Sequence, residues 1–288
     1  MYDLIVIGAG PAGVSAALYA RSRGLNLLVI EQEAVGGLIG KVSLVSHFSS
    51  VKPGETGPEF AKRLQAQLEA AEIPIVYEKI LKVEKTPDGF VAKARDKEFT
   101  ATKLIIAAGV RPKELPIEIP NNVTIHNWAL GREELVRDKT VVMNGGSDGA
   151  AKEALYLAKF AKQVHIVQDQ DRLLCIAEFK EQIEAANNIE VHCSSTLTAF
   201  DVQDKKLVGV KLSSGEITDP NGLEVFAMIG LVGNTEAFAK LVNLKNSFIE
   251  AHDLPAGLFV AGDIAVKDIK QVATAVASGC QAGILAAK

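Results

Sequence analysis

Hydrophobic positions change their spacing along the chain, and each change of spacing marks an element. Residues 3–8 (DLIVIG) form an apolar run typical of a strand buried on both faces of a parallel sheet. Helical spacing follows over residues 12–23, and a second apolar run covers residues 26–30. Strand, helix and strand in this order predict a βαβ unit.

A second helix is predicted over residues 57–71, where one face carries Phe60, Leu64, Leu68 and Ala71. Short β segments then run through residues 74–109 and end on the hydrophobic stretch LIIAAG. They predict a small antiparallel meander that is closed by a hydrophobic strand.

The same strand, helix and strand pattern returns after Thr140. A strand (VVMN), a glycine-rich turn (GGSDGA), a helix and the strand QVHIVQD follow one another, and the DKK turn at residues 204–206 predicts a later hairpin. The chain is therefore predicted to be α/β, with two Rossmann-like dinucleotide-binding domains. We expect residues 1–112 and 236–288 to form a discontinuous first domain, with a second domain, residues 113–235, inserted into it.

Composition and charge exclude some classes of binding partner. The net charge of -4 offers no basic face for nucleic acid or an anionic membrane, and no apolar run reaches the length of a membrane span. A strand that begins at the second or third residue leaves no room for a secretory signal, so we expect a cytoplasmic protein. Cys175, Cys193 and Cys280 are widely separated and are interpreted as small buried hydrophobes.

The turn after the first strand carries a GxGxxG motif. Gly8 permits the tight turn, Gly10 lets a pyrophosphate approach the backbone, and Gly13 lets the helix pack close to the sheet. The helix N-terminus adds its positive dipole end, and Glu31 follows the next strand, where an acidic side chain can bind ribose hydroxyls. The motif predicts a dinucleotide and does not distinguish FAD from NAD.

Further motifs identify the family. The pair Gly36-Gly37, the strand LIIAAG with Ala108 in place of a threonine, and LFVAGD with Gly262-Asp263 follow in order. Together with GAGPAG, the EALYL helix and KQVATAVASG, they resemble the two-dinucleotide-binding flavoproteins. Across essentially the whole chain the closest resemblance is to low-molecular-weight thioredoxin reductases.

This resemblance implies an FAD-binding homodimer. Asp263 would meet the ribityl chain of FAD, and the segment from Lys270 would start the last helix beside the isoalloxazine ring. The residues expected to contact FAD are Gly8, Gly10, Pro11, Ala12, Gly13, Glu31, Gln32, Gly37, Leu38, His47, Val83, Ala108, Gly109, Gly262, Asp263, Lys270, Gln271 and Val272.

The resemblance fails at the family's dithiol motif. An ungapped count back from Gly145 places Trp128 and Gly131 where that motif has its two cysteines, so disulfide reduction by the family's route is not expected. Trp128 either fills a domain interface or covers the flavin ring. His126 is the candidate proton donor to reduced flavin, whereas His47, where the family often has asparagine, is either structural or catalytic.

The second glycine loop also departs from the family. Ser147 replaces its middle glycine, and Gln168-Asp169-Gln170 replaces the His-Arg-Arg cluster that binds the 2′-phosphate of NADPH. NADPH is therefore disfavoured. Asp169 could accept a hydrogen bond from an unphosphorylated ribose, so NADH and an empty site both stay open.

Two functions follow from these residues. In the first, the protein is a redox enzyme that receives electrons from ferredoxin, flavodoxin or NADH and passes them through FAD to an acceptor other than a disulfide. In the second, it is a degenerate reductase that acts as a redox-sensing or binding module, with FAD as a structural or regulatory ligand. The vacated second site could then hold another ligand, such as a second flavin or an adenine nucleotide.

Overall fold

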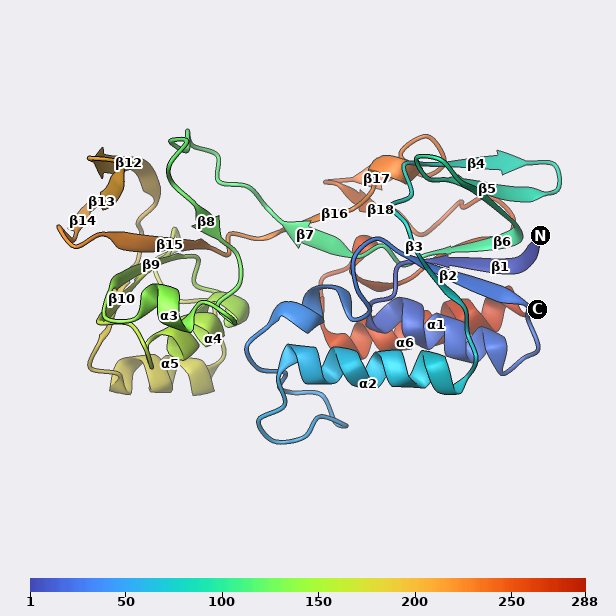
Figure 1. Ribbon diagram of the computed structural model, residues 1–288, viewed down its shortest axis with the longest axis horizontal. Helices are drawn as coiled ribbons and strands as arrows, with labels where there is room; N and C mark the ends of the chain where they lie inside the picture. The colour runs from blue at the N-terminus through green and yellow to red at the C-terminus, as the bar shows by residue number, and fades with distance from the viewer. The chain divides into compact units, whose positions relative to one another are not determined.

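The computed structural model describes residues 1–288 and divides them into two compact units (Figure 1). The first unit comprises Met1–Arg111 and Val232–Lys288, and the second comprises Pro112–Leu231. The chain passes between the units at β7 (Val110–Pro112) and β16 (Leu231–Gly233), which pair with each other. None of the helices is both long enough and apolar enough to cross a membrane.

The first unit contains a seven-stranded sheet and three α-helices. Its remaining elements are β1 (Tyr2–Ile7), α1 (Pro11–Arg21), β2 (Leu27–Glu31), η1 (Gly37–Lys41), α2 (Gly57–Ala70), β3 (Ile75–Tyr77), β4 (Lys82–Thr86), β5 (Gly89–Lys93), β6 (Glu98–Ile106), η2 (Glu236–Phe238), β17 (Leu244–Lys245), β18 (Phe248–Ile249), β19 (Leu258–Val260), η3 (Gly262–Ile264) and α6 (Val272–Ala286).

The long strand β6 organises this sheet, whose order is β3-β2-β1-β6-β5-β4. One edge of β6 pairs with β1 in parallel. Its other edge is shared, because Glu98–Ala101 pair with β5 in antiparallel register and Leu104–Ile106 pair in parallel with β19. The predicted meander β4-β5-β6 therefore continues the parallel sheet, and the C-terminal part of the chain returns to it through β19.

Alternation along β1 divides the first core in two. Leu4 and Val6 point into the cluster that α1, α2 and α6 cover, whereas Ile5 and Ile7 point into the cluster under β4 and β5. All four side chains are at most 6% exposed. Figure 1 shows the three helices together on one side of this sheet. The continuous apolar run of the sequence is explained by this burial on both faces.

The second unit repeats the βαβ theme around a five-stranded parallel sheet of order β11-β10-β9-β15-β8. Its elements are β8 (Ile125–His126), α3 (Glu133–Val136), β9 (Thr140–Asn144), α4 (Asp148–Leu157), β10 (Gln163–Val167), α5 (Ala177–Ala185), β11 (Ile189–His192), β12 (Leu197–Gln203), β13 (Lys206–Leu212), β14 (Gly215–Thr218) and β15 (Leu223–Ala227).

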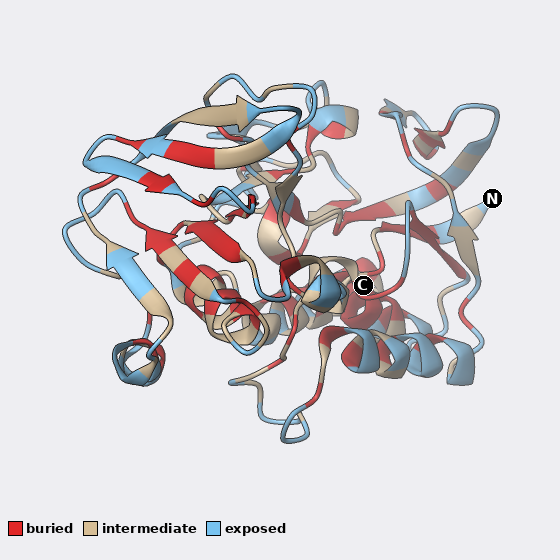
Figure 2. Ribbon diagram, turned by 60° about the vertical axis from the view of Figure 1, so that its left-hand side comes forward, coloured by how far each residue is buried: buried red, intermediate tan, exposed pale blue.

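Each face of this sheet has its own cover. Val141 and Met143 of β9 pack against α4 and α5, and Val142 between them packs under the three-stranded sheet β12-β13-β14. The predicted hairpin is confirmed, since Asp204 and Lys205 join β12 to β13 with φ values of 48° and 65°. In Figure 2 buried residues gather on the strands and on the sheet-facing sides of the helices.

The return to the first unit lies earlier than expected from the sequence. The predicted boundary was residue 236, but the first unit already includes Val232–Thr235. The backbone N–H of Asn234 donates to the Gly109 carbonyl (3.1 Å), and its side-chain amide donates to the Ala108 carbonyl (2.8 Å). These hydrogen bonds tie the segment to the end of β6, which no hydrophobic pattern in the sequence reveals.

Candidate functional site

The first glycine loop joins β1 to α1, and its outer glycines are required by the fold itself. Gly8 has φ 104°, and a Cβ there would lie 2.3 Å from the Ala107 carbonyl oxygen. A Cβ on Gly13 would lie 1.8 Å from the Gly8 carbonyl oxygen. Both contacts are impossible, so any side chain at either position would displace backbone.

Gly10 differs from its neighbours because nothing in the protein requires it. Its φ of -72° and ψ of -178° suit any residue. The nearest heavy atom to an added Cβ would be the Gly36 carbonyl oxygen, at 3.8 Å. The space in front of Gly10 is therefore open, and it lies at the N-terminus of α1. An unforced glycine at an open helix N-terminus fits the close approach of a dinucleotide pyrophosphate.

Glu31 ends β2 and turns its carboxylate toward this loop. The side chain is buried, at 7% exposure. One oxygen accepts a hydrogen bond from the Ala9 backbone N–H (2.7 Å), and the other accepts from that of Glu33 (2.9 Å). Since a carboxylate oxygen can accept more than one hydrogen bond, Glu31 is fixed in place and can still accept bonds from ribose hydroxyls.

The predicted double glycine lies beside the first loop. Gly36 donates its N–H to the Ala9 carbonyl (2.9 Å), and Gly37, with φ 58°, would bring a Cβ within 3.6 Å of the Gly10 Cα. Leu38 follows in η1 and is half-buried, whereas Gln32, next to Glu31, is exposed. The structure thus brings Gly8–Gly13, Glu31 and Gly36–Leu38 together.

Asp263 approaches the start of α1 through η3. A Cβ on Gly262 would lie 2.8 Å from the Ala12 Cβ, so η3 and α1 are in close contact. Asp263 Oδ1 lies 3.1 Å from Lys267 Nζ. Both atoms are buried and neither makes a hydrogen bond, although the ion pair joins them. A half-buried carboxylate with spare acceptor capacity fits a ligand hydroxyl here. Lys267 was missed by the sequence reasoning, although its i,i+4 spacing from Asp263 was a usable signal.

The predicted residues at the start of α6 already make contacts within the protein. Lys270 donates from Nζ to the Lys267 carbonyl (2.9 Å) and lies over the ring of Phe248 (4.3 Å). Gln271 is exposed, and Val272 packs against the helix-side core. Val83, on β4, is only 3% exposed inside the opposite core, so only its backbone can contact a ligand.

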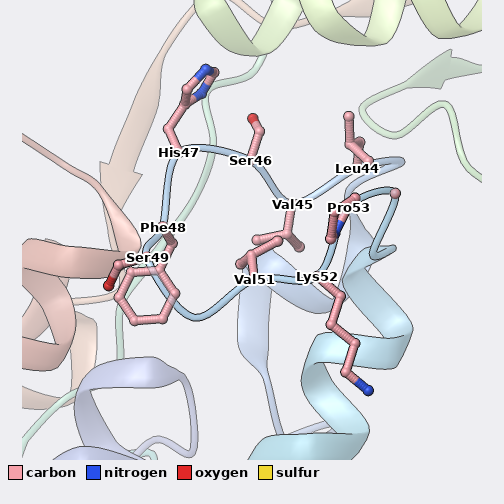
Figure 3. A pocket seen from close by; sticks show the side chains of 10 residues that line it. Leu44, Val45, Ser46, His47, Phe48, Ser49, Val51, Lys52 and Pro53 are labelled. Carbon is pink, nitrogen blue, oxygen red and sulfur yellow. The ribbon is translucent and has the colours of Figure 1, made fainter.

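His47 lies in the loop that joins η1 to α2. Its backbone has φ 59° and its side chain is exposed. The loop encloses an open hollow of about 510 Å³ that is lined only by residues 44–49 and 51–54. Figure 3 shows the His47 ring turned away from Val45 and Val51. Because no residue of the glycine loop lines this hollow, it is not the dinucleotide cradle.

The second glycine loop, between β9 and α4, has the same backbone conformation as the first at its first and middle positions. Gly145 has φ 128°, its N–H donates to the Val167 carbonyl (2.8 Å), and a Cβ there would lie 2.4 Å from the Met228 carbonyl oxygen. Gly8 likewise donates to the Ile30 carbonyl at 2.8 Å. Ser147 takes the position of Gly10, with φ -83° and ψ 176°. Its side chain therefore occupies the space that is open at Gly10.

Gln168, and not Asp169, corresponds to Glu31. It directly follows Val167, the hydrogen-bond acceptor of Gly145, as Glu31 directly follows Ile30. Gln168 is 5% exposed, and its Oε1 would lie 3.0 Å from a Cβ on Gly146. Asp169 is exposed. The position that corresponds to Glu31 therefore holds a neutral amide, because Asp169 lies two residues beyond the end of β10.

The chain after β10 closes over the N-terminus of α4. Leu174 donates its N–H to the Gly146 carbonyl (2.9 Å), and Ile176 donates to Oδ1 of Asp148 (2.8 Å). The nearby cation, Arg172, is exposed and pairs with Asp171 at 3.2 Å. The loop itself carries Asp148 and no basic residue. This arrangement offers a phosphate little compensating charge.

His126 is held within the second unit. On β8, its Nε2 lies 3.3 Å from Oε2 of Glu224, whose other oxygen accepts from Lys139 (2.7 Å). Burial alone would raise the pKa of Glu224, but the hydrogen bonds from His126 and Lys139 outweigh it and lower the pKa overall. Trp128 follows in the loop after β8 and is half-buried. The proton-donor and flavin-covering roles stay predictions.

All three cysteines are free thiols. Cys175 and Cys193 belong to the second unit and Cys280 to α6 of the first. Burial raises the pKa of the Cys175 thiol, which disfavours the reactive thiolate. The expectation of a buried small hydrophobe holds for Cys175, whereas Cys193 and Cys280 are half-buried.

Comparison with known proteins gives a consistent result. The family model of pyridine nucleotide-disulphide oxidoreductases matches residues 2–279. Thioredoxin reductase of Mycoplasma genitalium is 31% identical over 295 residues, which cover 98% of this chain and 93% of that protein. A 34.2 kDa protein in the rubredoxin operon of Clostridium pasteurianum is 30% identical and covers 99% of this chain and 96% of its own length.

Among solved structures, thioredoxin reductase of Lactococcus lactis superposes with a TM-score of 0.93 at 26% identity. The match covers 99% of this chain and 98% of that chain. Thioredoxin reductase of T. acidophilum gives a TM-score of 0.91 at 26% identity, with 99% and 97% covered. The predicted α/β fold with dinucleotide-binding domains is confirmed.

Proposed function

This chain belongs to the pyridine nucleotide-disulphide oxidoreductase family, and we propose that it passes electrons through FAD to an acceptor that is not a disulfide. The family implies an FAD-dependent oxidoreductase related to thioredoxin reductase. FAD, when bound, supplies the hydride and electron chemistry. The proposal concerns the donor, the acceptor and the residues that hold FAD.

The contrast between the two glycine loops supports the proposal most strongly. In front of Gly10 the first loop is open, and Glu31 is fixed beside it by two backbone hydrogen bonds. In the second loop Ser147 takes that place, and neutral Gln168 stands where Glu31 does. The first unit therefore suits a dinucleotide, and the second has lost features that a phosphorylated pyridine nucleotide needs.

The residues of the first unit have distinct proposed roles. The N-terminus of α1 stabilises the pyrophosphate, and Glu31 orients a ribose. Asp263 accepts a hydrogen bond from the ribityl chain, and the ion pair with Lys267 holds its carboxylate in position. The N-terminus of α6, near Lys270 and Gln271, stabilises negative charge on reduced flavin.

The acceptor is proposed to be something other than a disulfide because the cysteines do not form the required pair. Disulfide reduction needs one thiolate that attacks and a second thiol that resolves the mixed disulfide. The segment between β8 and β9 has Trp128 and Gly131 and no cysteine. We propose that Trp128 covers the flavin face and that His126 supplies a proton.

The donor is proposed to be a small redox protein such as ferredoxin or flavodoxin, with NADH as the second candidate. Gln168 and Gln170 cannot pair with a 2′-phosphate, and each lost charge-assisted hydrogen bond costs about 1.5–3 kcal/mol. Two lost bonds weaken NADPH binding by about a hundredfold or more. We also propose, from the family resemblance, that the protein is a homodimer.

Anaerobic reduction of the purified holoprotein tests the donor. Reduced ferredoxin, reduced flavodoxin, NADH and NADPH are each mixed with it in a stopped-flow instrument, and flavin absorbance is followed. We expect a protein donor or NADH to bleach the flavin rapidly and NADPH to do so slowly and without saturation. Rapid bleaching at micromolar NADPH would refute the assignment of the second unit. A flavin that none of the four reduces would favour the sensing module instead.

A further inference from the structure

Three metal-ligating side chains meet on one face of the second unit's sheet. His165 lies on β10, and Glu190 and His192 lie on the edge strand β11. The parallel register pairs His165 with Glu190 and Val167 with His192. Since alternate residues of a strand share a face, all three side chains lie on the face that carries Val142 and Val167.

The spacing of the ligand atoms matches that of a metal site. His165 Nδ1 lies 3.0 Å from His192 Nε2 and 3.4 Å from one oxygen of Glu190. His192 Nε2 lies 3.7 Å from the other oxygen. Bonds of about 2.0–2.1 Å in a tetrahedral site place neighbouring ligand atoms about 3.3 Å apart. The three separations lie on both sides of that value, so small rotations of the side chains would complete the site.

The chemistry of this set points to one class of cation. Two imidazole nitrogens with one carboxylate suit Zn²⁺ and similar divalent transition metals better than Mg²⁺ or Ca²⁺, which prefer oxygen ligands. Two ring nitrogens at 3.0 Å can share one proton but cannot each point a proton at the other. A bound cation would displace that shared proton and satisfy both nitrogens.

The three side chains differ in exposure, and this difference suits the binding of a metal ion from solution. The side chains of His165 and His192 are 14% and 22% exposed, whereas that of Glu190 is 58% exposed. The histidines are thus held by their surroundings, and the outer side admits an ion and a water as fourth ligand. The carboxylate of Glu190 lies 3.4 Å from a ring nitrogen of His165 and 3.7 Å from one of His192.

We propose that His165, Glu190 and His192 form a binding site for one divalent transition-metal ion of the Zn²⁺ class. The ion would join the edge strand β11 to β10. The site adjoins the second glycine loop, because Gln168 donates its backbone N–H to the His192 carbonyl (2.9 Å). Its ligands lie wholly in the second unit, so the proposal does not depend on FAD or on the proposed electron donor.

Zinc titration of the holoprotein tests this site. The protein is stripped with a chelator, desalted and titrated with ZnCl₂ by isothermal calorimetry, and bound metal is counted by mass spectrometry. We expect one Zn²⁺ per chain and a rise in melting temperature on binding. His192→Ala and Glu190→Gln should each weaken binding by at least 10–100-fold, the range found for loss of outer partners of metal ligands. Far-UV circular dichroism confirms that each variant is folded.

His252→Ala is the matched control. His252 also lies near two carboxylates, 3.8 Å from Glu250 and 3.2 Å from Asp253, but its side chain is 65% exposed and no second histidine joins it. Its removal should leave zinc affinity unchanged. The site is overturned if the wild type shows no saturable zinc binding, if folded His192→Ala and Glu190→Gln bind as tightly as the wild type, or if His252→Ala abolishes binding.

Discussion

The first and middle residues of the two glycine loops have similar backbone conformations, but their side chains leave different amounts of space at the helix N-terminus. Gly8 and Gly145 have φ values of 104° and 128°, and a Cβ on either would meet a carbonyl oxygen, at 2.3 and 2.4 Å. At the next key position, Gly10 and Ser147 have nearly the same dihedral angles. Only the first loop leaves the position in front of its helix empty.

This comparison separates what the fold needs from what the ligand needs. Both loops keep the glycine without which the strand-to-helix turn cannot form. The second loop has lost the glycine that the turn does not require, and Gln168 has replaced the carboxylate that Glu31 supplies. Gly10, which no protein contact requires, is present where a dinucleotide pyrophosphate would approach the loop. The second unit thus keeps the architecture of a nucleotide domain, and we propose that its site binds a dinucleotide more weakly.

The largest expected effect comes from Gly10→Val. Its backbone angles suit valine, so the variant should fold, but the new side chain would occupy the pyrophosphate's place and FAD would be lost. Ser147→Val places the same side chain at the corresponding position of the second loop, and this variant should still bind FAD in the first unit. Flavin content after purification, measured from absorbance, compares the two. Equal flavin content in both variants would contradict the different roles of the loops.

The next expected effect is the absence of disulfide reductase activity. Wild-type protein should not turn over thioredoxin or an aromatic disulfide with any donor that reduces its flavin, because it lacks an attacking and resolving thiol pair. Cys193→Ser and Cys280→Ser should not change flavin reduction. Catalytic turnover of either disulfide by the wild type would show that two distant cysteines cooperate after all.

Exchange of Glu31 for Gln should have a smaller effect and makes the first loop more like the second. Both oxygens of Glu31 accept backbone hydrogen bonds, whereas a glutamine offers only one acceptor and turns an N–H group toward another donor. A buried donor without a partner costs about 1–3 kcal/mol. Urea unfolding of the apoprotein should reveal this loss, and FAD affinity should fall by a similar free energy. An unchanged unfolding midpoint would show that the hydrogen bonds of Glu31 do not stabilise the loop.

The smallest expected effect concerns Trp128, the single tryptophan of the chain. If it covers the flavin ring, as proposed, its fluorescence should be strongly quenched in the holoprotein and recover when FAD is removed. Trp128→Ala should then speed the reaction of reduced flavin with small oxidants. An emission that does not respond to FAD would leave Trp128 as an interface residue only.

Local patterns predicted much of this fold. The apolar runs that form β1 and β2, the face of α2 with Phe60, and the turn at Asp204 depend on neighbours in sequence, so they were readable. The pairing of strands that lie far apart in the chain could not be predicted from the sequence. The addition of β19 beside β5 on one edge of β6 depends on strands more than 150 residues apart.

Residues of the candidate site could be predicted only where they belong to a recognisable sequence motif. Gly8, Gly10, Gly13 and Glu31 were found from spacing, and the structure brings them together. The correspondence of Gln168 with Glu31 needed the observed hydrogen bonds, since Asp169 lies one residue away and is the acidic residue. The pairing of His165 with His192 depends on the register of two parallel strands, which the sequence does not state.

Non-denaturing mass spectrometry of the wild-type protein tests the central contrast most directly. The protein is measured as purified and again after incubation with excess FAD and excess NADPH. The contrast between the loops predicts one FAD per chain in each case and no further nucleotide. A chain that carries two dinucleotides, or a chain that stays free of FAD, would contradict it.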